Sequence, residues 1–173
     1  MPRDETKPMR YFITFACYGA RLHGAEAGSV DLRHNLPGAP LVEPDSMRVA
    51  FELNRMGQPP FFLDTESRAT VLEALHEVCA SRDWTLFAAH VRTNHVHTVV
   101  EAGVLPEKVM NAFKAYASRR LNRAPPCEVA RKHWARHGST KWLWNDKDAR
   151  AAIRYVVEEQ GEPMAVFVLP DRL

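Results

Sequence analysis

Two runs of strand-forming residues that lie only three residues apart constrain this chain more than any other feature. Residues 84–91 (WTLFAAHV) and 95–101 (HVHTVVE) are rich in aromatic and β-branched side chains, which favour strands. The connection, residues 92–94, is short enough for a β-hairpin, so the two strands would be antiparallel neighbours. We therefore expect an antiparallel sheet that includes this hairpin.

Three helices are indicated around the hairpin by apolar residues, capping residues and helix stop signals. The first follows Asp64 or Thr65, either of which can cap its N-terminus. The second begins after Pro106, and a pair of prolines stops it. The third starts near Asp146, with acidic residues in its first turn, and ends at Gly161. The apolar stripes of the first two helices predict that they pack on the sheet.

Further strands are predicted at residues 11–18 and 164–169. Residues 22–60 are rich in Gly and Pro and are interpreted as an irregular insertion, with a short strand at 47–53. Residues 131–144 are interpreted as an irregular basic loop. The resulting order, strand, insertion, helix, hairpin, helix, loop, helix and strand, favours an α+β fold with helices packed on one face of the sheet. The length of 173 residues fits one domain, residues 1–173.

The composition excludes several classes of protein. With 46% hydrophobic and 25% charged residues, the chain can bury a core, so it is not disordered throughout. No uncharged apolar run near the N-terminus approaches the ~20 residues of a membrane span, and no secretory signal is visible there. Three widely separated cysteines favour neither disulfides nor a zinc site. A cytoplasmic protein without membrane contact is expected.

The net charge of +2 is small, but the basic residues are unevenly distributed. They crowd residues 108–141, where Glu128 is the only acid and several aromatic residues are interspersed. This pattern is typical of a nucleic-acid-binding surface. The alternative interpretation is a solvated helical face that keeps the protein soluble.

The pair His95 and His97 is the sharpest local feature. Side chains alternate along a strand, so both imidazoles would lie on one face, where they could bind a divalent metal ion. The alternative is a pair of half-buried strand histidines. On the last predicted helix, Tyr155 and Glu159 are four residues apart and project from one side. Together these residues would supply three metal ligands and a nucleophile, because a metal-polarised phosphodiester is an electrophile that a tyrosine can attack. Tyr116 is a second candidate nucleophile.

Four segments of the chain together resemble a known family. They are YFITFACYGARLHG (11–24), NHVHTVVEA (94–102), MNAFKAYASRRLNR (110–123) and RYVVEEQ (154–160). In this order they resemble the single-tyrosine HUH transposases of the IS200 type and their REP-associated relatives. HUH denotes histidine, a bulky hydrophobic residue and histidine, which the sequence 95–97 fits. The segment 94–97 is the most specific part of the resemblance.

The resemblance implies a ferredoxin-like (RRM-like) fold with a central antiparallel sheet. It also implies a Mg²⁺ or Mn²⁺ ion held by His95, His97 and a residue one turn after the tyrosine. That residue is often Gln or Asn in the family, whereas this chain has Glu159, with Gln160 as the alternative ligand. A carboxylate suits either ion, so the difference does not argue against activity.

The implied activity is metal-dependent nicking and strand transfer of single-stranded DNA, with Tyr155 forming a 5′-phosphotyrosine intermediate. The expected partner is single-stranded or hairpin DNA. The residues expected to hold its backbone or stack on its bases are Lys114, Arg119, Arg120, Arg123, Arg131, Lys132, Trp142 and Trp144. Family members occur as dimers and as single subunits, so both a homodimer and a monomer stay open. Two alternatives also stay open: a non-catalytic DNA- or RNA-binding module with this fold, and an unrelated metal hydrolase.

Overall fold

A computed structural model of the protein describes residues 8–20, 46–124 and 131–170. These residues form one five-stranded sheet in which all neighbouring strands are antiparallel. The strand order is β4-β1-β3-β2-β5. The strands are β1 (Met9–Ala16), β2 (Thr85–Val91), β3 (His95–Ala102), β4 (Ser139–Leu143) and β5 (Ala165–Val168). The helices are α1 (Ser46–Arg55), α2 (Thr65–Arg82), α3 (Pro106–Arg123) and α4 (Asp146–Glu158).

Six of these elements, β1, α2, β2, β3, α3 and β4 in chain order, form a βαββαβ unit with sheet order β4-β1-β3-β2. This is the ferredoxin-like arrangement, so the predicted α+β fold class is confirmed. The final helix α4 and strand β5 extend the unit, with β5 pairing along the outer edge of β2. None of the helices in the described residues is long and apolar enough to cross a membrane.

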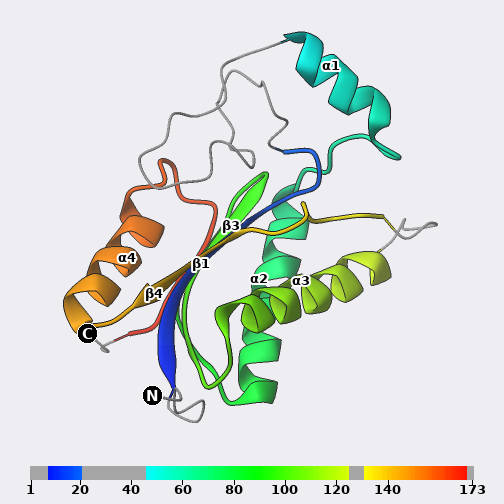
Figure 1. The fold of residues 1–173 in the computed structure, drawn as a ribbon. Helices are drawn as coiled ribbons and strands as arrows, with labels where there is room; N and C mark the ends of the chain where they lie inside the picture. Colours follow the sequence, from blue (N-terminus) through cyan, green and yellow to red (C-terminus); the bar gives the residue numbers. More distant parts are fainter. Residues whose placement is uncertain (1–7, 21–45, 125–130, 171–173) are drawn as a thin grey trace.

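Helices cover both faces of the sheet, as Figure 1 shows. Helices α2 and α3 lie together on one face, which confirms that helices cover a face of the sheet. Helix α4 packs on the opposite face, against Phe12, Phe87 and Val99, so the prediction that all helices share one face is wrong for α4. The physical reason is that the central strands carry apolar side chains on both faces, so both need a cover. This second face also carries His95 and His97.

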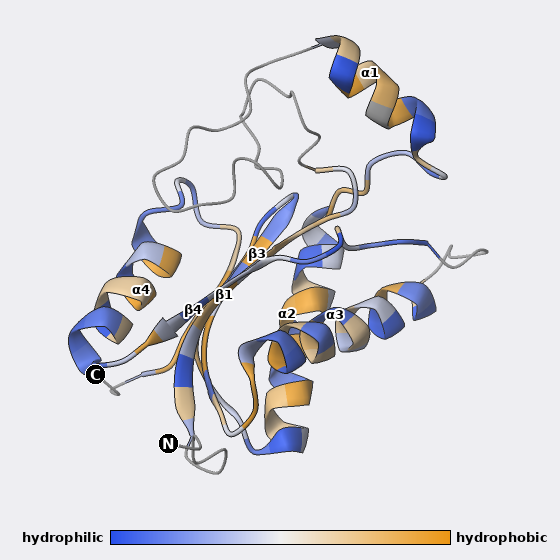
Figure 2. Cartoon of the chain, viewed as in Figure 1, coloured by the Kyte–Doolittle hydropathy of each residue, from blue (hydrophilic) through white to orange (hydrophobic). Residues whose placement is uncertain are grey.

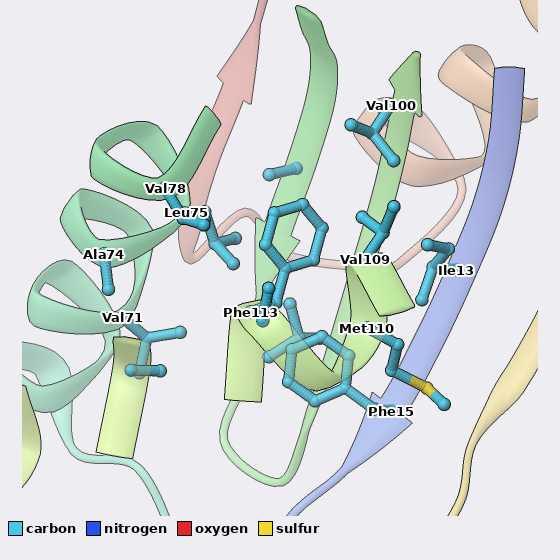
Figure 3. Packing of buried hydrophobic residues seen from close by; sticks show 14 of the residues in the cluster. Ile13, Phe15, Val71, Ala74, Leu75, Val78, Val100, Val109, Met110 and Phe113 are labelled. Atoms are coloured by element: carbon cyan, nitrogen blue, oxygen red, sulfur yellow. The ribbon is translucent and has the colours of Figure 1, made fainter. Parts of the chain in front are cut away.

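The larger core lies between the sheet and the helices α2 and α3 (Figure 3). Phe113 of α3 and Phe15 of β1 are its largest fully buried side chains, and Met110 lies beside them. Helix α2 contributes an apolar stripe to the same core, which includes Val71, Leu75 and Val78. Along α3, hydrophilic residues are interspersed with the hydrophobic ones (Figure 2), and the charged residues Glu107, Lys108, Arg119 and Arg123 are exposed. The fold therefore presents the charged side of α3 to solvent, as its amphipathic pattern predicts.

The ends of the helices follow from local sequence signals. The side chain of Asp64 accepts a hydrogen bond of 2.8 Å from the backbone N–H of Ser67, which confirms Asp64 as the N-cap of α2. Asp83 ends the same helix in the left-handed conformation (φ 55°). Pro106 stands in the first turn of α3, where a missing N–H costs no helical hydrogen bond. Helix α4 ends at Glu158, earlier than the predicted end at Gly161.

Two elements differ from the sequence predictions. Residues 47–53 belong to the helix α1 rather than to a strand, because good helix formers such as Met47, Ala50 and Leu53 outweigh the β-branched Val49. Residues 139–143 form strand β4, although they were predicted to be irregular. Long-range pairing with β1 stabilises this strand. The chain enters it at Gly138, where a Cβ atom would lie 2.6 Å from the carbonyl oxygen of Thr14. Of the predicted insertion, residues 22–45 lie outside the described residues.

Candidate active site

His95 and His97 lie on the face of the sheet that α4 covers. In the β1–β3 register, His95 lies opposite Ala16 and His97 lies opposite Thr14. The centroids of the two imidazole rings are 4.7 Å apart. His97 is buried, with 5% of its surface exposed, whereas His95 is half-buried at the end of β3. The pair therefore presents two imidazoles at one end of this face, one deeper than the other.

Each imidazole has a hydrogen-bond partner on its Nδ1 atom. His95 Nδ1 lies 2.7 Å from Asn94 Oδ1, and because a carbonyl oxygen only accepts, Nδ1 carries the hydrogen. Nε2 of His95 then holds the lone pair. His97 Nδ1 lies 2.7 Å from the hydroxyl oxygen of Thr14, which can accept in the same way. This is the arrangement that orients metal-binding histidines in proteins.

Tyr155 reaches the histidines from α4. The helix is anchored by Ala149 and Val156, which are fully buried against the sheet. Tyr155 is 41% exposed, and its ring contacts His97 edge-on with a centroid distance of 5.8 Å. It makes a similar contact, also 5.8 Å, with Phe12. The fold thus brings together a tyrosine and two histidines that are far apart in the sequence.

The third predicted metal ligand lies at the C-terminal end of α4. Glu159 is exposed at the C-cap of α4, where its backbone N–H donates to the carbonyl of Tyr155. The side-chain amide of Gln160 donates to the same carbonyl at 3.1 Å. Within residues 8–20, 46–124 and 131–170, no three His, Cys, Asp or Glu side chains gather as a metal-binding group. The structure therefore offers a histidine pair, with Glu159 and Gln160 on the turn that follows the tyrosine helix.

Two of the predicted DNA-binding cations bind other parts of the protein. The ammonium of Lys114 donates to the carbonyls of Ala135 and His137, and its burial lowers the pKa of the lysine. Arg120 donates to Glu73 and Glu77 of α2, at 2.9 and 2.6 Å. Lys114 thus organises the segment that leads into β4, and Arg120 links α3 to α2.

The other predicted cations are exposed: Arg119, Arg123, Arg131 and Lys132. Arg119 and Arg123 are on α3, on the opposite side of the sheet from the histidines. Arg119 lies over the ring of Tyr116, 4.4 Å from its centroid. Because α3 lies on that opposite side, Tyr116 is not part of the histidine cluster.

Trp142 and Trp144 stack on each other, with ring centroids 5.2 Å apart. Trp142 also contacts Tyr11, on the face that α2 and α3 cover, whereas Trp144 is 65% exposed. The pair is therefore a stacked aromatic surface at the end of the edge strand β4, away from the histidines.

One cation on the face of the histidines is not among the site residues predicted from the sequence. Lys141 of β4 pairs with Phe12 of β1, and paired residues of antiparallel strands point to the same face. Lys141 therefore lies on the face of His97 and Tyr155, where it is exposed. Only the prediction of β4 as a strand next to β1 could have revealed this position.

Residues 60–147 match the protein family described as "Transposase IS200 like", which is just over half of the chain. The chain belongs to this IS200-like transposase family. The matched region includes both histidines, α3 and β4, and it ends before Tyr155. The family match therefore includes the strand that carries the histidines. The position of Tyr155, outside the match, is given by the packing of α4.

Two solved structures are similar to this IS200-like chain. One is a REP-associated tyrosine transposase bound to a REP hairpin, with 13% identity and a TM-score of 0.46. The match covers 86% of this chain, which spans 64% of the length of that protein. The other is a candidate transposase from Deinococcus radiodurans R1, with 17% identity and a TM-score of 0.44, covering 92% of this chain and 96% of that one. No protein with a curated function matches the sequence.

Proposed function

We propose that this IS200-like protein nicks and rejoins single-stranded DNA through a covalent bond to Tyr155. The observation that carries the proposal is the position of Tyr155, whose ring lies 5.8 Å from that of His97 although the two are on different elements. Membership of a transposase family indicates that the substrate is DNA. The 41% exposure of Tyr155 supports access of a DNA strand to its hydroxyl.

In the proposed reaction, the hydroxyl oxygen of Tyr155 attacks the phosphorus atom of a phosphodiester. A bond forms between that oxygen and phosphorus, and the bond from phosphorus to the 3′ oxygen breaks. The phenol loses its proton and the departing 3′ oxygen gains one, so the products are a 5′-phosphotyrosine and a free 3′-hydroxyl. Attack of another 3′-hydroxyl on the phosphotyrosine reverses these changes and joins two strands.

Two imidazoles with an oxygen donor are ligands that suit a divalent ion. Asn94 and Thr14 contact the rings of His95 and His97 at Nδ1, so Nε2 would be the coordinating atom of each ring. Glu159 or Gln160 would complete the protein ligands for Mg²⁺ or Mn²⁺. When bound, such an ion neutralises charge on the scissile phosphate and makes the phosphorus more electrophilic.

The proposed DNA contacts follow from exposure and position. Lys141 lies on the face of the histidines and would hold a phosphate next to the scissile one. The exposed residues Arg119, Arg123, Arg131 and Lys132 would hold the backbone farther away, and Trp144 would stack on an unpaired base. For Lys114 and Arg120 we propose supporting roles, because their charged groups already bind the carbonyls and carboxylates described above.

A covalent-trapping experiment tests the proposal. The protein is incubated with Mn²⁺ and labelled hairpin-bearing single strands of varied sequence, and adducts are resolved on a denaturing gel. We expect an adduct with the wild type and none with Tyr155→Phe, which removes one oxygen and keeps DNA binding. Tyr116→Phe is the matched control and should form the adduct.

Each other outcome identifies a different function. DNA binding without an adduct in the wild type would identify a binding module. Cleavage without an adduct would identify a metal hydrolase. An adduct that persists in Tyr155→Phe and is lost in Tyr116→Phe would move the nucleophile to α3.

A further inference from the structure

His90 is a buried histidine that the proposed reaction does not use. It lies on β2, pairs with His97 of β3 and has no exposed surface. Its Nδ1 atom lies 3.0 Å from the carbonyl oxygen of Val156, in the last turn of α4. The backbone N–H of Met164, just before β5, donates to its Nε2 atom at 3.1 Å. One imidazole thus joins the sheet to both ends of the turn that follows α4.

The partners determine the tautomer of His90. A carbonyl oxygen only accepts, so Nδ1 carries a hydrogen and donates to Val156. A backbone N–H only donates, so Nε2 is unprotonated. The guanidinium of Arg92, whose Nη1 atom is 3.3 Å from Nε2, is a second donor on that side. Burial lowers the pKa of His90, which agrees with a neutral ring.

The bond to Val156 meets a specific need of the helix end. The last four carbonyls of an α-helix have no partner within the helix, and α4 ends at Glu158. Val156 is fully buried, so an unpaired carbonyl there would destabilise the end of the helix. Tyr155 is the residue immediately before Val156, and its own carbonyl already accepts from Gln160. Because the last turn of α4 carries the tyrosine, the anchor of this turn sets where the tyrosine lies.

The turn after α4 is also held by Arg92, the residue that follows β2. Arg92 Nη1 donates to the carbonyl of Glu162 at 3.0 Å, and Gly161 takes a left-handed conformation with φ 77°. Glu159 and Gln160, the two candidate metal ligands on this turn, therefore lie between two anchored points, Val156 and Glu162.

We infer that His90 is a positioning residue: its neutral imidazole fixes the last turn of α4 on the sheet and thereby holds Tyr155 beside His97. The expected effect of His90 on the rate of adduct formation rests on the proposed function. Its structural consequence, the place of the tyrosine ring, can be measured without metal or DNA.

Three variants separate the two hydrogen bonds of His90. His90→Phe keeps an aromatic ring and removes both bonds. His90→Asn places an amide donor near the position of Nδ1, so it can bind the Val156 carbonyl. His90→Gln places its amide near the position of Nε2, where the amide oxygen can accept from the backbone N–H of Met164 instead. We expect His90→Asn to retain the place of Tyr155 better than the other two.

The first measurement is ¹⁹F NMR of metal-free protein labelled with 3-fluorotyrosine. The sequence has four tyrosines, and Tyr155→Phe assigns the relevant resonance. We expect His90→Phe to shift or broaden the Tyr155 resonance, His90→Asn to restore it, and the Tyr116 resonance of α3 to stay unchanged in both.

The second measurement is the rate of adduct formation at saturating DNA. A displacement of about 1 Å can slow a positioned reaction by about 100-fold, so we expect His90→Phe to lose at least about tenfold in rate. Its dissociation constant for DNA should stay within about threefold, since the cations are untouched, and His90→Asn should recover most of the rate. Such a rescue separates positioning from a general loss of stability.

The inference is overturned if the Tyr155 resonance of His90→Phe matches the wild type, or if His90→Asn is no better than His90→Phe. It is also overturned if the variants fall in rate only in proportion to their loss of folded protein. If the wild type forms no adduct while the NMR results are as expected, the proposed function fails and the positioning role of His90 stands.

Discussion

Single hydrogen bonds to Nδ1 orient the two imidazoles that we propose as metal ligands. Thr14→Val and Asn94→Ala each remove one partner of Nδ1 and leave both histidines in the chain. We expect each change to weaken Mn²⁺ binding about 10- to 100-fold in calorimetry, and His97→Ala to abolish it. The matched control is Thr98→Val, because Thr98 points to the other face of β3 and bonds the carbonyl of Ile13. The proposed site would be contradicted if Thr14→Val and Asn94→Ala both kept the Mn²⁺ affinity of the wild type and a normal circular dichroism spectrum.

At the scale of elements, two neighbouring arginines of α3 have different surroundings. Arg119→Ala removes an exposed charge, so the slope of DNA affinity against salt should fall by about one. Arg120→Ala should leave that slope unchanged, since Glu73 and Glu77 already neutralise the guanidinium. Loss of these exposed ion pairs should lower the free energy of unfolding by less than about 1 kcal/mol. Anisotropy titrations at several salt concentrations and urea unfolding measure the two effects, and equal slopes for both variants would be inconsistent with this assignment.

The strand β4 contributes a cation on the face of the histidines. Lys141→Ala should reduce the salt slope and also slow adduct formation at saturating DNA, because the lost charge lies on the face of the histidines, where the reacting phosphate would bind. Lys108→Ala is the control, an exposed lysine at the start of α3. It should leave the rate at saturating DNA unchanged. The assignment of Lys141 to the site fails if the two variants react at the same rate.

At the scale of the whole molecule, one chain places its own tyrosine beside its own histidines. A mixture of His97→Ala and Tyr155→Phe should therefore form no adduct, although each variant carries the group that the other lacks. The measurement is the covalent-trapping gel with the two proteins at equal concentration, and the wild type diluted with His97→Ala is the control. Recovery of the adduct in the mixture would mean that the tyrosine helix reaches the histidines of a second copy.

The sequence by itself determined the features that depend on neighbouring residues. The three-residue connection defines the hairpin, and the period of two in a strand puts His95 and His97 on one face. Asp64 and Pro106 set the starts of two helices through their local chemistry. The same local reasoning failed for residues 47–53, where helix propensity outweighed a short apolar pattern.

Only the tertiary structure decided which distant groups meet. Strand β4 exists because β1 pairs with it, and this pairing alone brings Lys141 to the face of the histidines. Lys114 and Arg120 looked like phosphate ligands in the sequence, but carbonyls and carboxylates from other elements already bind them. The place of Tyr155 depends on α4 covering the second face of the sheet and on the bond from His90 to Val156. The energies of such long-range contacts are set by how the elements pack, which no local pattern encodes.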